Sequence, residues 1–564
     1  MPTRAGYLAL RGAMAATQEP RYRRLLASAE APDEAQARLL RAILEANRET
    51  TFGAGHRFGA IRTVEDYRQA VEVQTYEDLR DHVERQELTG KPELTAEAPV
   101  YYNRTSGTSG APKNIPLTAS GLQRLKVHQR LATHIWSKAA PILSGKVFLV
   151  GGAAVEGHMP GGTAYGSATG KLRENQPRLL RRRYTLPVSV ADVDDYESRY
   201  LIMAILGLAD PAVTSVGTAN PSTLLRLHAV IHEHADTILG AVAAGRLPDG
   251  LAAHLDPEED PGLKPRPDRA AQLQRVLDTR GRLTFGAIWP RLAGVVTWTG
   301  GSCGAALGSV EALLPESCIV IEAGWVASEM QGTINVDPTS NTCVPVLGDT
   351  FFEFAEREAW EAGSREMLPV GELVTGRDYY VVVTTPDGLY RYDMNDIVRV
   401  AGRVGATPAL VFVQKGSGTT SITGEKLHES QVLDTVPHVL GGHGLTAGFF
   451  IMLADVDAAS YTLYVEGGDP TAGRAPSPGA GPAPEHALAD EIDDHLRSMN
   501  IEYDSKRGSG RLGALSLRRL QPGTGAEYRR RQVAAGQRDA QFKYLHVQYR
   551  HDCAFDFDAF AGRD

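Results

Sequence analysis

The sequence predicts an α/β protein, with a large N-terminal domain of mixed sheets and helices and a smaller α+β C-terminal domain. Strand-like runs such as KVFLVGG and YYVVVTT alternate with helical patterns over most of the chain. The character changes after residue 413, where the glycine- and hydroxyl-rich stretch GSGTTSITGEKL indicates a hinge. The chain has 564 residues, and at roughly 100–200 residues per domain this suggests two or more domains. We therefore expect domains at 1–413 and 414–564.

Helices are expected in the first part of the chain. Residues 34–49 place four apolar side chains on one helical face: Leu39, Leu40, Ile43 and Leu44. The segments TVEDYRQAVEV and TYEDLRDHVERQ each open with threonine and acidic residues, which are typical of helix starts. A further helical pattern runs from Ser120 to about Ala139. Strands are expected in KVFLVGG, AGVVTWTGGS, IVIEAGWV and YYVVVTT.

Beyond the hinge, the pattern is that of a small α+β domain. FFIMLADV, YTLYVEG and ALSLRRL are expected to be strands, and residues 485–498 a helix. Residues 467–484 (GGDPTAGRAPSPGAGPAP) are of low complexity. A segment of this composition cannot bury apolar area, so we expect an exposed flexible loop.

Composition and charge exclude several classes of protein. A hydrophobic share of 42% and a charged share of 23% are typical of globular proteins rather than of disordered or fibrous chains. The net charge of −9 argues against nucleic acid or an anionic membrane as the main partner. The four cysteines show no CxxC spacing, so neither a disulfide framework nor a zinc ribbon is expected. No apolar run reaches the roughly 18 residues of a membrane span, and no signal peptide is evident, so we expect a cytoplasmic protein.

The strongest local signal is the segment from Thr105 to Lys113, TSGTSGAPK. Glycines that alternate with hydroxyl residues expose backbone N–H groups and O–H donors to a phosphate, and the lysine adds a positive charge. Only 11 of the 59 basic residues are lysine, which makes a lysine inside a motif informative. The segment lacks the GxxxxGK pattern of P-loop enzymes, so their mechanism is not transferred. A polar turn between a strand and a helix is the alternative.

Three further segments carry polar residues next to predicted strands, where ligands bind in α/β sheets. Residues 298–302 (WTGGS) suit an adenine-contacting loop or a tight turn. Residues 326–329 (VASE) offer a hydroxyl and a carboxylate for a phosphate oxygen and Mg²⁺, although Glu329 alone is more often a surface carboxylate. Asp396 lies in GLYRYDMNDIV, expected to be a turn into a strand and out again. Its carboxylate suits two ribose hydroxyls or caps the turn.

Two lysines and one histidine cluster complete the candidates. Lys426 in GEKL and Lys543 in AQFKY are motif lysines, with a solvated surface as the alternative for each. Four residues form an HxxxHEH pattern on an expected helix, namely His228, His232, Glu233 and His234. Histidines four residues apart can share a metal, but no third ligand at matching spacing is evident. An ordinary helix face is therefore favoured over a metal site.

In their order and separation, these segments resemble the Gretchen Hagen family of acyl acid amido synthetases, known from plant auxin-responsive enzymes and bacterial relatives. The resemblance runs nearly end to end and suggests a bacterial-type member. It is carried by LLRAILEANRETTFGAGHRF, VEVQTYEDLRDHVER, the phosphate loop TSGTSGAPKNIP, the adenine loop GVVTWTGGS, WVASEMQGTIN, LGDTFFEFAE, LPVGELVTGRDYYVVVTTPDGLYRYDMNDIVRV and QFKY. The long block that ends in DIVRV is the most specific of these.

The chain departs from the family pattern at a few positions. Asn395 stands where the family usually has a glycine before the ribose aspartate, and asparagine tolerates left-handed backbone better than most residues. Trp325 replaces the tyrosine of the family's YASSE element, and Ala327 replaces its first serine, which removes one hydroxyl. The loop at 467–484 looks like an addition.

The resemblance implies a two-step reaction on an adenylate-forming N-terminal domain with a mobile C-terminal domain. A carboxylic acid would attack MgATP to form an acyl-adenylate, and an amine, usually an amino acid, would then take the acyl group. Lys543 and Lys426 are implied as catalytic, and Glu329 as the Mg²⁺ ligand. The implied ATP-binding residues are Ser106, Gly107, Thr108, Ser109, Lys113, Gly300, Gly301, Ser302, Ala327, Ser328, Glu329 and Asp396. The helix at 120–139 would line the acyl pocket, with Arg124, His128, Arg130 and His134 among its polar residues.

Two other functions stay open at this stage. The same adenylate could pass its acyl group to coenzyme A or to a carrier-protein thiol, although no carrier protein is indicated. An inactive adenylate-binding regulator is the third possibility, and the intact Lys113, Glu329, Asp396 and Lys543 argue against it. The expected partners are a small carboxylic acid and an amine or amino acid, with no nucleic acid and no membrane. The sequence identifies neither the acid nor the amine.

Overall fold

The computed structural model describes residues 4–105, 113–176, 178–256, 259, 261–416, 418–423, 425–467, 485–508, 511–535, 539 and 542–562. The chain forms two compact units, which are described separately. Unit 1 comprises Met1–Ala219, Leu227–Thr299 and Leu314–Phe412. Unit 2 comprises Asn220–Arg226, Gly300–Leu313 and Val413–Asp564. The expected mixed α/β class, with a larger and a smaller part, is confirmed. The predicted boundary at residue 413 stays a prediction, because unit 2 also takes in two short segments from earlier in the chain.

Unit 1 contains three four-stranded sheets and one hairpin among its described residues. One sheet has the order β3-β6-β7-β8 and is parallel throughout. A second, with the order β11-β12-β13-β14, contains the antiparallel pairs β11–β12 and β12–β13. The third sheet has the order β2-β1-β5-β4, and β9 pairs with β10. The strands are β1 (Pro99–Thr105), β2 (Lys113–Thr118), β3 (Lys146–Leu149), β4 (Gly157–His158), β5 (Ala164–Gly166), β6 (Val213–Gly217), β7 (Gly294–Thr297), β8 (Ile319–Glu322), β9 (Thr333–Asp337), β10 (Thr342–Pro345), β11 (Phe351–Glu356), β12 (Asp378–Thr384), β13 (Tyr392–Val404) and β14 (Thr407–Lys415).

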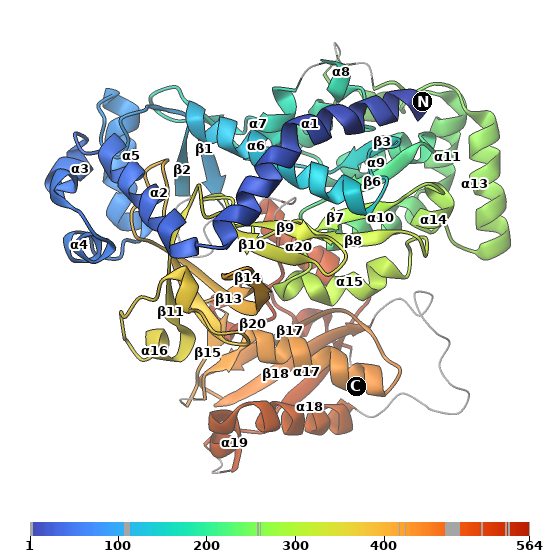
Figure 1. Cartoon of the computed structure of the whole chain (residues 1–564). Coiled ribbons are helices and arrows are strands. Elements are labelled where there is room, and N and C mark those ends of the chain that lie inside the picture. The colour runs from blue at the N-terminus through green and yellow to red at the C-terminus, as the bar shows by residue number, and fades with distance from the viewer. Residues whose placement is uncertain are drawn as a thin grey trace. The chain divides into compact units, whose positions relative to one another are not determined.

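The helices expected in the first part of the chain are confirmed. Thr63 and Thr75 cap α4 and α5 with reciprocal bonds to Asp66 and Asp78, as the acidic residues after each threonine indicated. The long N-terminal helix α1 contacts α6 and crosses it (Figure 1). The helices of this part of the chain are α1 (Arg4–Ala29), α2 (Pro32–Ala46), α3 (Thr51–Gly55), η1 (Phe58–Ala60), α4 (Val64–Ala70), α5 (Tyr76–Thr89), α6 (Ala119–Ala139), α7 (Ala168–Glu174), α8 (Arg178–Arg181), η2 (Val188–Asp192), α9 (Tyr196–Ala209), α10 (Ser222–Glu233), α11 (Ala235–Ala244), α12 (Asp249–Ala252), α13 (Pro267–Arg280), α14 (Phe285–Ile288), α16 (Arg357–Glu361) and η4 (Val370–Glu372).

The prediction of a turn into a strand and out again around Asp396 is wrong in part. Asp396 lies inside β13, a continuous strand that begins at Tyr392. The register slips at this point, because Tyr380 of β12 pairs with Ile397 while Val382 pairs with Asp393. The extra residues on β13 make a β-bulge, which redirects side chains without ending the strand. The bulge arises from the pairing with β12, so the local sequence alone did not reveal it.

Unit 2 is built on the mixed sheet β19-β18-β17-β20, whose two faces bury different sets of side chains. Successive residues of a strand point to opposite faces. Phe450 and Met452 of β17 pack into a core with α17 and α18 residues, whereas Phe449 and Ile451 pack with Tyr528 of α20. The chain here forms η3 (Gly301–Cys303), α15 (Gly304–Glu311), β15 (Thr419–Thr420), β16 (Leu427–His428), α17 (Glu429–Gly442), β17 (Ala447–Asp455), β18 (Ser460–Gly467), α18 (Glu485–Met499), α19 (Ile501–Gly508), β19 (Ser516–Leu520), α20 (Thr524–Ala534), β20 (Val547–Tyr549), η6 (Arg550–Asp552) and η7 (Asp558–Phe560).

Two further expectations concern this part of the chain. The strands predicted in FFIMLADV, YTLYVEG and ALSLRRL and the helix at 485–498 are confirmed as β17, β18, β19 and α18. The predicted loop at 467–484 lies outside the described residues except for Gly467. Within the described part of the chain, no helix combines the length and the apolar character that crossing a membrane would require.

Candidate active site

The predicted phosphate loop is described only at its two ends. Thr105 ends β1 and Lys113 begins β2, and the two residues are register partners in this antiparallel pair. The donors expected between them, Ser106, Gly107, Thr108 and Ser109, lie outside the described residues. The β1–β2 pair thus fixes where the loop leaves and re-enters unit 1.

A tight turn between β8 and β9 carries the VASE segment. The backbone N–H of Trp325 donates to Oγ1 of Thr333 at 2.8 Å, and the Trp325 carbonyl accepts from the N–H of Gly332 at 2.9 Å. Gly324 precedes the turn with a φ of 93°, and a Cβ there would lie 2.7 Å from the carbonyl oxygen of Thr333. Only glycine fits this close approach, so the sequence holds the turn against the start of β9.

The tip of this turn presents Ser328 and Glu329. Ala327 and Met330 close the tip with two backbone hydrogen bonds, of 3.0 and 3.3 Å. The side-chain amide of Asn103 in β1 donates to the carbonyl of Ser328 at 2.8 Å. Asn103, which the sequence analysis missed, therefore ties the β1–β2 pair to the turn. The predicted loss of one hydroxyl at Ala327 leaves Ser328 as the hydroxyl residue of this tip.

Lys113 and Glu329 meet at one tyrosine hydroxyl. Nζ of Lys113 donates to Oη of Tyr392 at 3.1 Å, and Oη donates to Oε1 of Glu329 at 3.5 Å. The Lys113 ammonium also lies 5.7 Å from the centroid of the tyrosine ring, a cation–π distance. Burial, followed by the nearby charge of Glu329, raises the pKa of Tyr392 well above its ordinary value. The hydroxyl is therefore a neutral group between two charged ones.

Tyr392 itself was not predicted as a site residue. It lies in GLYRYDMNDIV, four positions before Asp396, in the block that carries the most specific resemblance. This position, close to Asp396 in a specific motif, was the signal in the sequence that could have identified Tyr392 as a site residue. A tyrosine at the start of a strand is more often a core residue, and the link that Tyr392 makes between Lys113 and Glu329 is evident only from its contacts.

Asp396 is held by the residue that departs from the family pattern. The indole N–H of Trp325 donates to Oδ2 of Asp396 at 2.8 Å, and both side chains are buried. Asn395 has a φ of 49°, and its N–H donates to Oδ1 of Asp393 at 2.7 Å. The expectation that asparagine accommodates left-handed backbone here is confirmed. Trp325 and Glu329 belong to the same turn. The bond from Trp325 therefore connects Asp396 to the turn that carries Glu329.

The predicted adenine loop spans the two units. Thr299 belongs to unit 1 and donates its N–H and its hydroxyl to Oε2 of Glu322, at 2.7 and 2.5 Å. Gly300, Gly301 and Ser302 belong to unit 2, where Gly301 has a φ of 59° and begins η3. Tight left-handed backbone at glycine agrees with the predicted turn, and the adenine contact stays a prediction.

Lys426 and Lys543 both lie in unit 2. Lys426 is exposed and has a φ of 45°, and its carbonyl accepts from the Asn500 side chain at 3.2 Å. Left-handed backbone at a lysine is strained, and the hinge predicted in this segment stays a prediction. Neither observation tests its proposed contact with a phosphate or carboxylate.

The segment that carries Lys543 is anchored by its neighbours. Phe542 is buried, its carbonyl accepts from the side-chain amide of Asn220 at 2.5 Å, and its ring lies 4.9 Å from that of Tyr544. Arg529 is 5.6 Å from the Phe542 ring. The half-buried Lys543 therefore extends from a fixed backbone.

The polar residues predicted for the acyl pocket lie in different surroundings. Arg124 pairs with Asp349 at 2.6 Å and with Asp387 at 2.5 Å, so its charge is already matched by two carboxylates. Burial, followed by the Arg124 charge, lowers the pKa of His128 to about 4. Arg130 is exposed, and His134 is buried with Nε2 at 3.1 Å from Glu19. Arg124 and His128 thus share one partly buried cluster, and an acyl pocket here stays a prediction.

Burial also changes the pKa of a carboxylate in the same cluster. It raises the pKa of Asp349 to about 6, with Arg124 opposing the shift. The hydroxyl and N–H of Thr118 donate to Oδ1 of Asp387 at 2.6 and 3.0 Å. The cluster therefore connects the start of α6 to the segments before β11 and before β13.

The histidine pattern at 228–234 does not form a metal site in the described part of the chain. Nε2 of His232 lies 3.2 Å from Nε2 of His228 and accepts from the N–H of Leu283 at 3.3 Å. Across the residues that the structure describes, no three histidines, cysteines or carboxylates gather at metal-binding distance. The preference for an ordinary helix face over a metal site stays a prediction.

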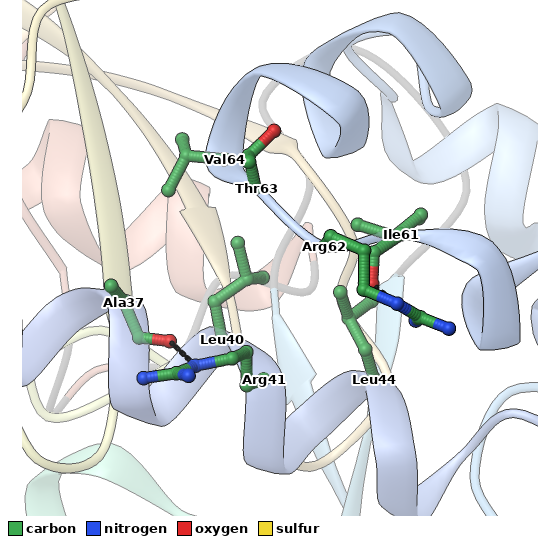
Figure 2. A pocket seen from close by; sticks show the side chains of 8 residues that line it. All are labelled: Ala37, Leu40, Arg41, Leu44, Ile61, Arg62, Thr63 and Val64. Atoms are coloured by element: carbon green, nitrogen blue, oxygen red, sulfur yellow. Dashed lines mark hydrogen bonds between the residues drawn. The ribbon is translucent and has the colours of Figure 1, made fainter.

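A shallow pocket lies apart from the predicted residues, between α2 and the link into α4 (Figure 2). Its lining is mainly apolar, with Arg41 and Arg62 at the edge. Both arginines donate to backbone carbonyls, Arg41 to Ala37 at 3.3 Å and Arg62 to Gly59 at 2.9 Å. None of the residues proposed for nucleotide or acid binding lines it.

Three protein-family models match the chain, and together they cover most of it. The GH3 family N-terminal domain matches residues 21–319, the GH3 family central domain residues 343–415, and the GH3 family C-terminal domain residues 431–551. These ranges include the β1–β2 pair, β13 and the strands β17 to β20, and each range carries predicted site residues.

Plant proteins of known name are similar over nearly the full length. Indole-3-acetic acid-amido synthetase GH3.15 of Arabidopsis thaliana is 25% identical over 545 residues, which cover 90% of this chain and 89% of that protein. Indole-3-acetic acid-amido synthetase GH3.8 of Oryza sativa subsp. indica is 25% identical over 550 residues, covering 91% and 87%.

Solved structures show the same fold. The GH3.15 acyl acid amido synthetase superposes with a TM-score of 0.82 at 19% identity, covering 96% of each chain. A 2-hydroxyisobutyryl-CoA ligase superposes with a TM-score of 0.54 at 12% identity, covering 92% of this chain and 90% of that one. The fold is therefore that of adenylate-forming enzymes.

Proposed function

Since the chain belongs to the GH3 family, the Gretchen Hagen acyl acid amido synthetases, we propose that it is an ATP-dependent ligase that joins a carboxylic acid to an amine. The acid is first activated as an acyl-adenylate, and the amine, proposed to be an amino acid, then takes the acyl group. The observation that carries the proposal most directly is the meeting of Lys113 and Glu329 at the Tyr392 hydroxyl.

The arrangement suits the triphosphate of ATP. Two anions must approach each other in the first step, so positive charge and hydrogen-bond donors are needed where negative charge develops. Lys113 supplies a charge at one end of the predicted phosphate loop. Asp396, whose carboxylate is oriented by Trp325, is proposed to accept hydrogen bonds from the ribose hydroxyls.

The residues present also fit Mg²⁺. This ion prefers oxygen ligands and is usually held by one or two carboxylates together with substrate phosphates. Glu329 is a half-buried carboxylate at the tip of a turn, beside the proposed phosphate lysine. Bound together with ATP, Mg²⁺ would neutralise part of the phosphate charge. Glu329 is the residue proposed to hold it.

The first step forms a bond between a carboxylate oxygen of the acid and the α-phosphorus of ATP. The bond from that phosphorus to the bridging oxygen breaks, and diphosphate leaves. Lys543 is proposed to stabilise the charge that develops in this step, because it extends from an anchored backbone in unit 2. Lys426 is proposed as a second contact to phosphate or carboxylate.

The second step forms a bond between the amine nitrogen and the acyl carbon. The bond from that carbon to the phosphate oxygen breaks, AMP leaves and the nitrogen loses a proton. A thioester would arise in the same way if a coenzyme A or carrier thiol attacked instead. The family membership supports the amide, and the 2-hydroxyisobutyryl-CoA ligase shares the fold at 12% identity without deciding the acceptor.

Several predictions from the sequence accompany this proposal. The bacterial origin, the cytoplasmic location and the domain rotation between the two steps stay predictions. The same holds for the absence of nucleic-acid, membrane and carrier-protein partners.

The test is diphosphate release from ATP, measured over aryl, fatty and amino-acyl acids. For each acid that gives release, amino acids, other amines and thiols are then added and the products are identified by mass spectrometry. An amide with release of AMP is expected. A thioester without amide would replace the proposal by a thiol ligase, and the absence of acid-dependent diphosphate release with every acid would indicate a regulator.

A further inference from the structure

Tyr392 lies between two side chains of opposite charge that would otherwise attract each other. Its hydroxyl accepts from Lys113 at 3.1 Å and donates to Glu329 at 3.5 Å. The three residues come from different parts of unit 1, namely β2, the VASE turn and the first position of β13. The tyrosine is almost fully buried, with 1% of its surface exposed, so its ring has little freedom to move away.

The backbone on either side of Tyr392 is fixed by other contacts. The N–H of Gln74 donates to the carbonyl of Arg391 at 2.8 Å, and the N–H of Asp393 donates to the carbonyl of Gln74 at 2.8 Å. Tyr392 is also in register with Val383 of β12. Hydrogen bonds on both sides therefore hold the residue in one place.

The residue before Tyr392 has strained backbone that a buried ion pair stabilises. Arg391 has a φ of 42°, an uncommon conformation for a residue with a side chain. Its guanidinium donates to Glu353 at 2.9 Å and to the carbonyl of Val71 at 2.8 Å. Strain of this kind persists only where surrounding contacts enforce it, and it is concentrated at functional sites. Here the strained backbone of Arg391 sets the direction in which the chain enters Tyr392.

We propose that Tyr392 is a positioning residue that keeps Lys113 and Glu329 apart until MgATP binds. The inference rests on the proposed function, in which Lys113 contacts phosphate and Glu329 contacts Mg²⁺. Without the hydroxyl, the ammonium and the carboxylate would be free to form a direct ion pair. ATP would then have to break that pair before either residue could bind it.

The hydroxyl is suited to this role because it can bond to both partners at once. A tyrosine hydroxyl donates one hydrogen bond and accepts others. A charged residue at this position would favour one partner over the other, and an apolar one would bond to neither.

The test compares Tyr392→Phe with Tyr390→Phe. Tyr390 is a matched control, because it lies two positions earlier and is equally buried, and its hydroxyl donates to the carbonyl of Leu94 at 2.6 Å. Calorimetry with a non-hydrolysable ATP analogue, with and without Mg²⁺, measures binding without requiring any product. For Tyr392→Phe the analogue should bind about 10-fold more weakly in the absence of Mg²⁺, because it must first break the partly buried ion pair between Lys113 and Glu329. Tyr390→Phe should bind it within about 3-fold of the wild type.

A second substitution separates this role from a merely structural one. In Tyr392→Phe/Glu329→Gln the carboxylate charge is gone, so Lys113 has no direct ion pair to form. Mg²⁺-free binding of the analogue should return to within about 3-fold of the Glu329→Gln single variant. A Tyr392→Phe variant that binds the analogue like the wild type, or a double variant that gains nothing over Tyr392→Phe, would overturn the inference. If the wild type itself failed to bind the analogue, the proposed function would fail instead.

Discussion

The carboxylate of Glu429 accepts a hydrogen bond of 2.6 Å from the backbone N–H of His546. Glu429 is the first residue of α17, and His546 follows Lys543 by three positions, so this bond ties the start of α17 to the Lys543 segment. The carboxylate is packed closely, since a Cβ on Gly418 would lie 3.1 Å from its Oε2. A buried carboxylate therefore supports the segment proposed to act in adenylation.

Glu429→Gln should remove one source of pH dependence from stability. Burial raises the pKa of Glu429 from 4.5 to about 7, while the His546 bond and the Lys543 charge oppose the shift. The folded protein therefore binds this proton more tightly than the unfolded chain, and the wild type loses stability as pH rises from about 4.5 to about 7. Glutamine cannot ionise, so the variant avoids this loss, which reaches about 3 kcal/mol above pH 7.

The measurement is the melting temperature of both proteins at pH 5 and pH 8. All other titrating groups are common to the two, including Asp349 and the buried histidines, so their effects cancel in the difference. The melting temperature of Glu429→Gln relative to the wild type should be higher at pH 8 than at pH 5. An unchanged difference would mean that Glu429 titrates near its ordinary pKa.

Trp325→Phe should weaken the recognition of ribose. The phenyl ring retains most of the apolar contact but has no N–H for Oδ2 of Asp396, so the carboxylate loses the bond that orients it. One hydrogen bond to a charged group is worth about 1.5–3 kcal/mol. Only part of this free energy should appear in the preference for ATP over 2′-deoxy-ATP. The preference for ATP over 2′-deoxy-ATP, measured as a ratio of kcat/KM in diphosphate release, should fall by about 5-fold. Trp360→Phe in α16 is the control and should keep the wild-type ratio. A Trp325→Phe enzyme that discriminates as well as the wild type would separate the indole from Asp396 function.

The helices and most strands followed from local signals in the sequence. Thr63 and Thr75 precede α4 and α5. Each threonine forms a capping box with the aspartate three residues later, in which each side chain bonds to the backbone N–H of the other residue. The alternation of Phe449, Phe450, Ile451 and Met452 between the two faces of β17 follows from the geometry of a strand. Such features depend on neighbours along the chain.

The parts that were missed depend on residues far apart in sequence. The bulge at Asp396 results from the register between β13 and β12, and the position of Tyr392 between Lys113 and Glu329 results from contacts among three separate segments. Composition changes near residue 413, but it gives no sign that Asn220 would donate to the carbonyl of Phe542. In the candidate site, Lys113, Glu329 and Asp396 were proposed because they belong to motifs, and their roles in binding ATP stay predictions. The residues that orient them were not identified.

Arg124→Ala should destabilise unit 1 more than it affects acid binding. Removing the guanidinium leaves Asp349 and Asp387 without their cation in a partly buried cluster. We expect a loss of about 2 kcal/mol, less than for a fully buried pair because the Arg124 side chain is 27% exposed. Arg130→Ala, on the same helix but exposed, should change stability by less than about 0.5 kcal/mol. Thermal unfolding measures both. If the Michaelis constant for the acid rose in Arg124→Ala while the melting temperature stayed constant, Arg124 would be an acid-binding residue, as the family resemblance implied.

Lys543→Ala should slow the first step and spare the second. If the ammonium stabilises charge while the carboxylate attacks the α-phosphorus, its loss should slow acid-dependent diphosphate release by roughly 10²–10³-fold, as for the removal of one preorganised electrostatic contact. The backbone should remain in place, since the bonds from Asn220 to Phe542 and from His546 to Glu429 do not involve the lysine side chain. Lys506→Ala, in α19 of the same unit, controls for the removal of a lysine. A pre-made acyl-adenylate supplied with the amine should still be converted to the amide at close to the wild-type rate. Normal diphosphate release with blocked amide formation would contradict this prediction and place Lys543 in the transfer step.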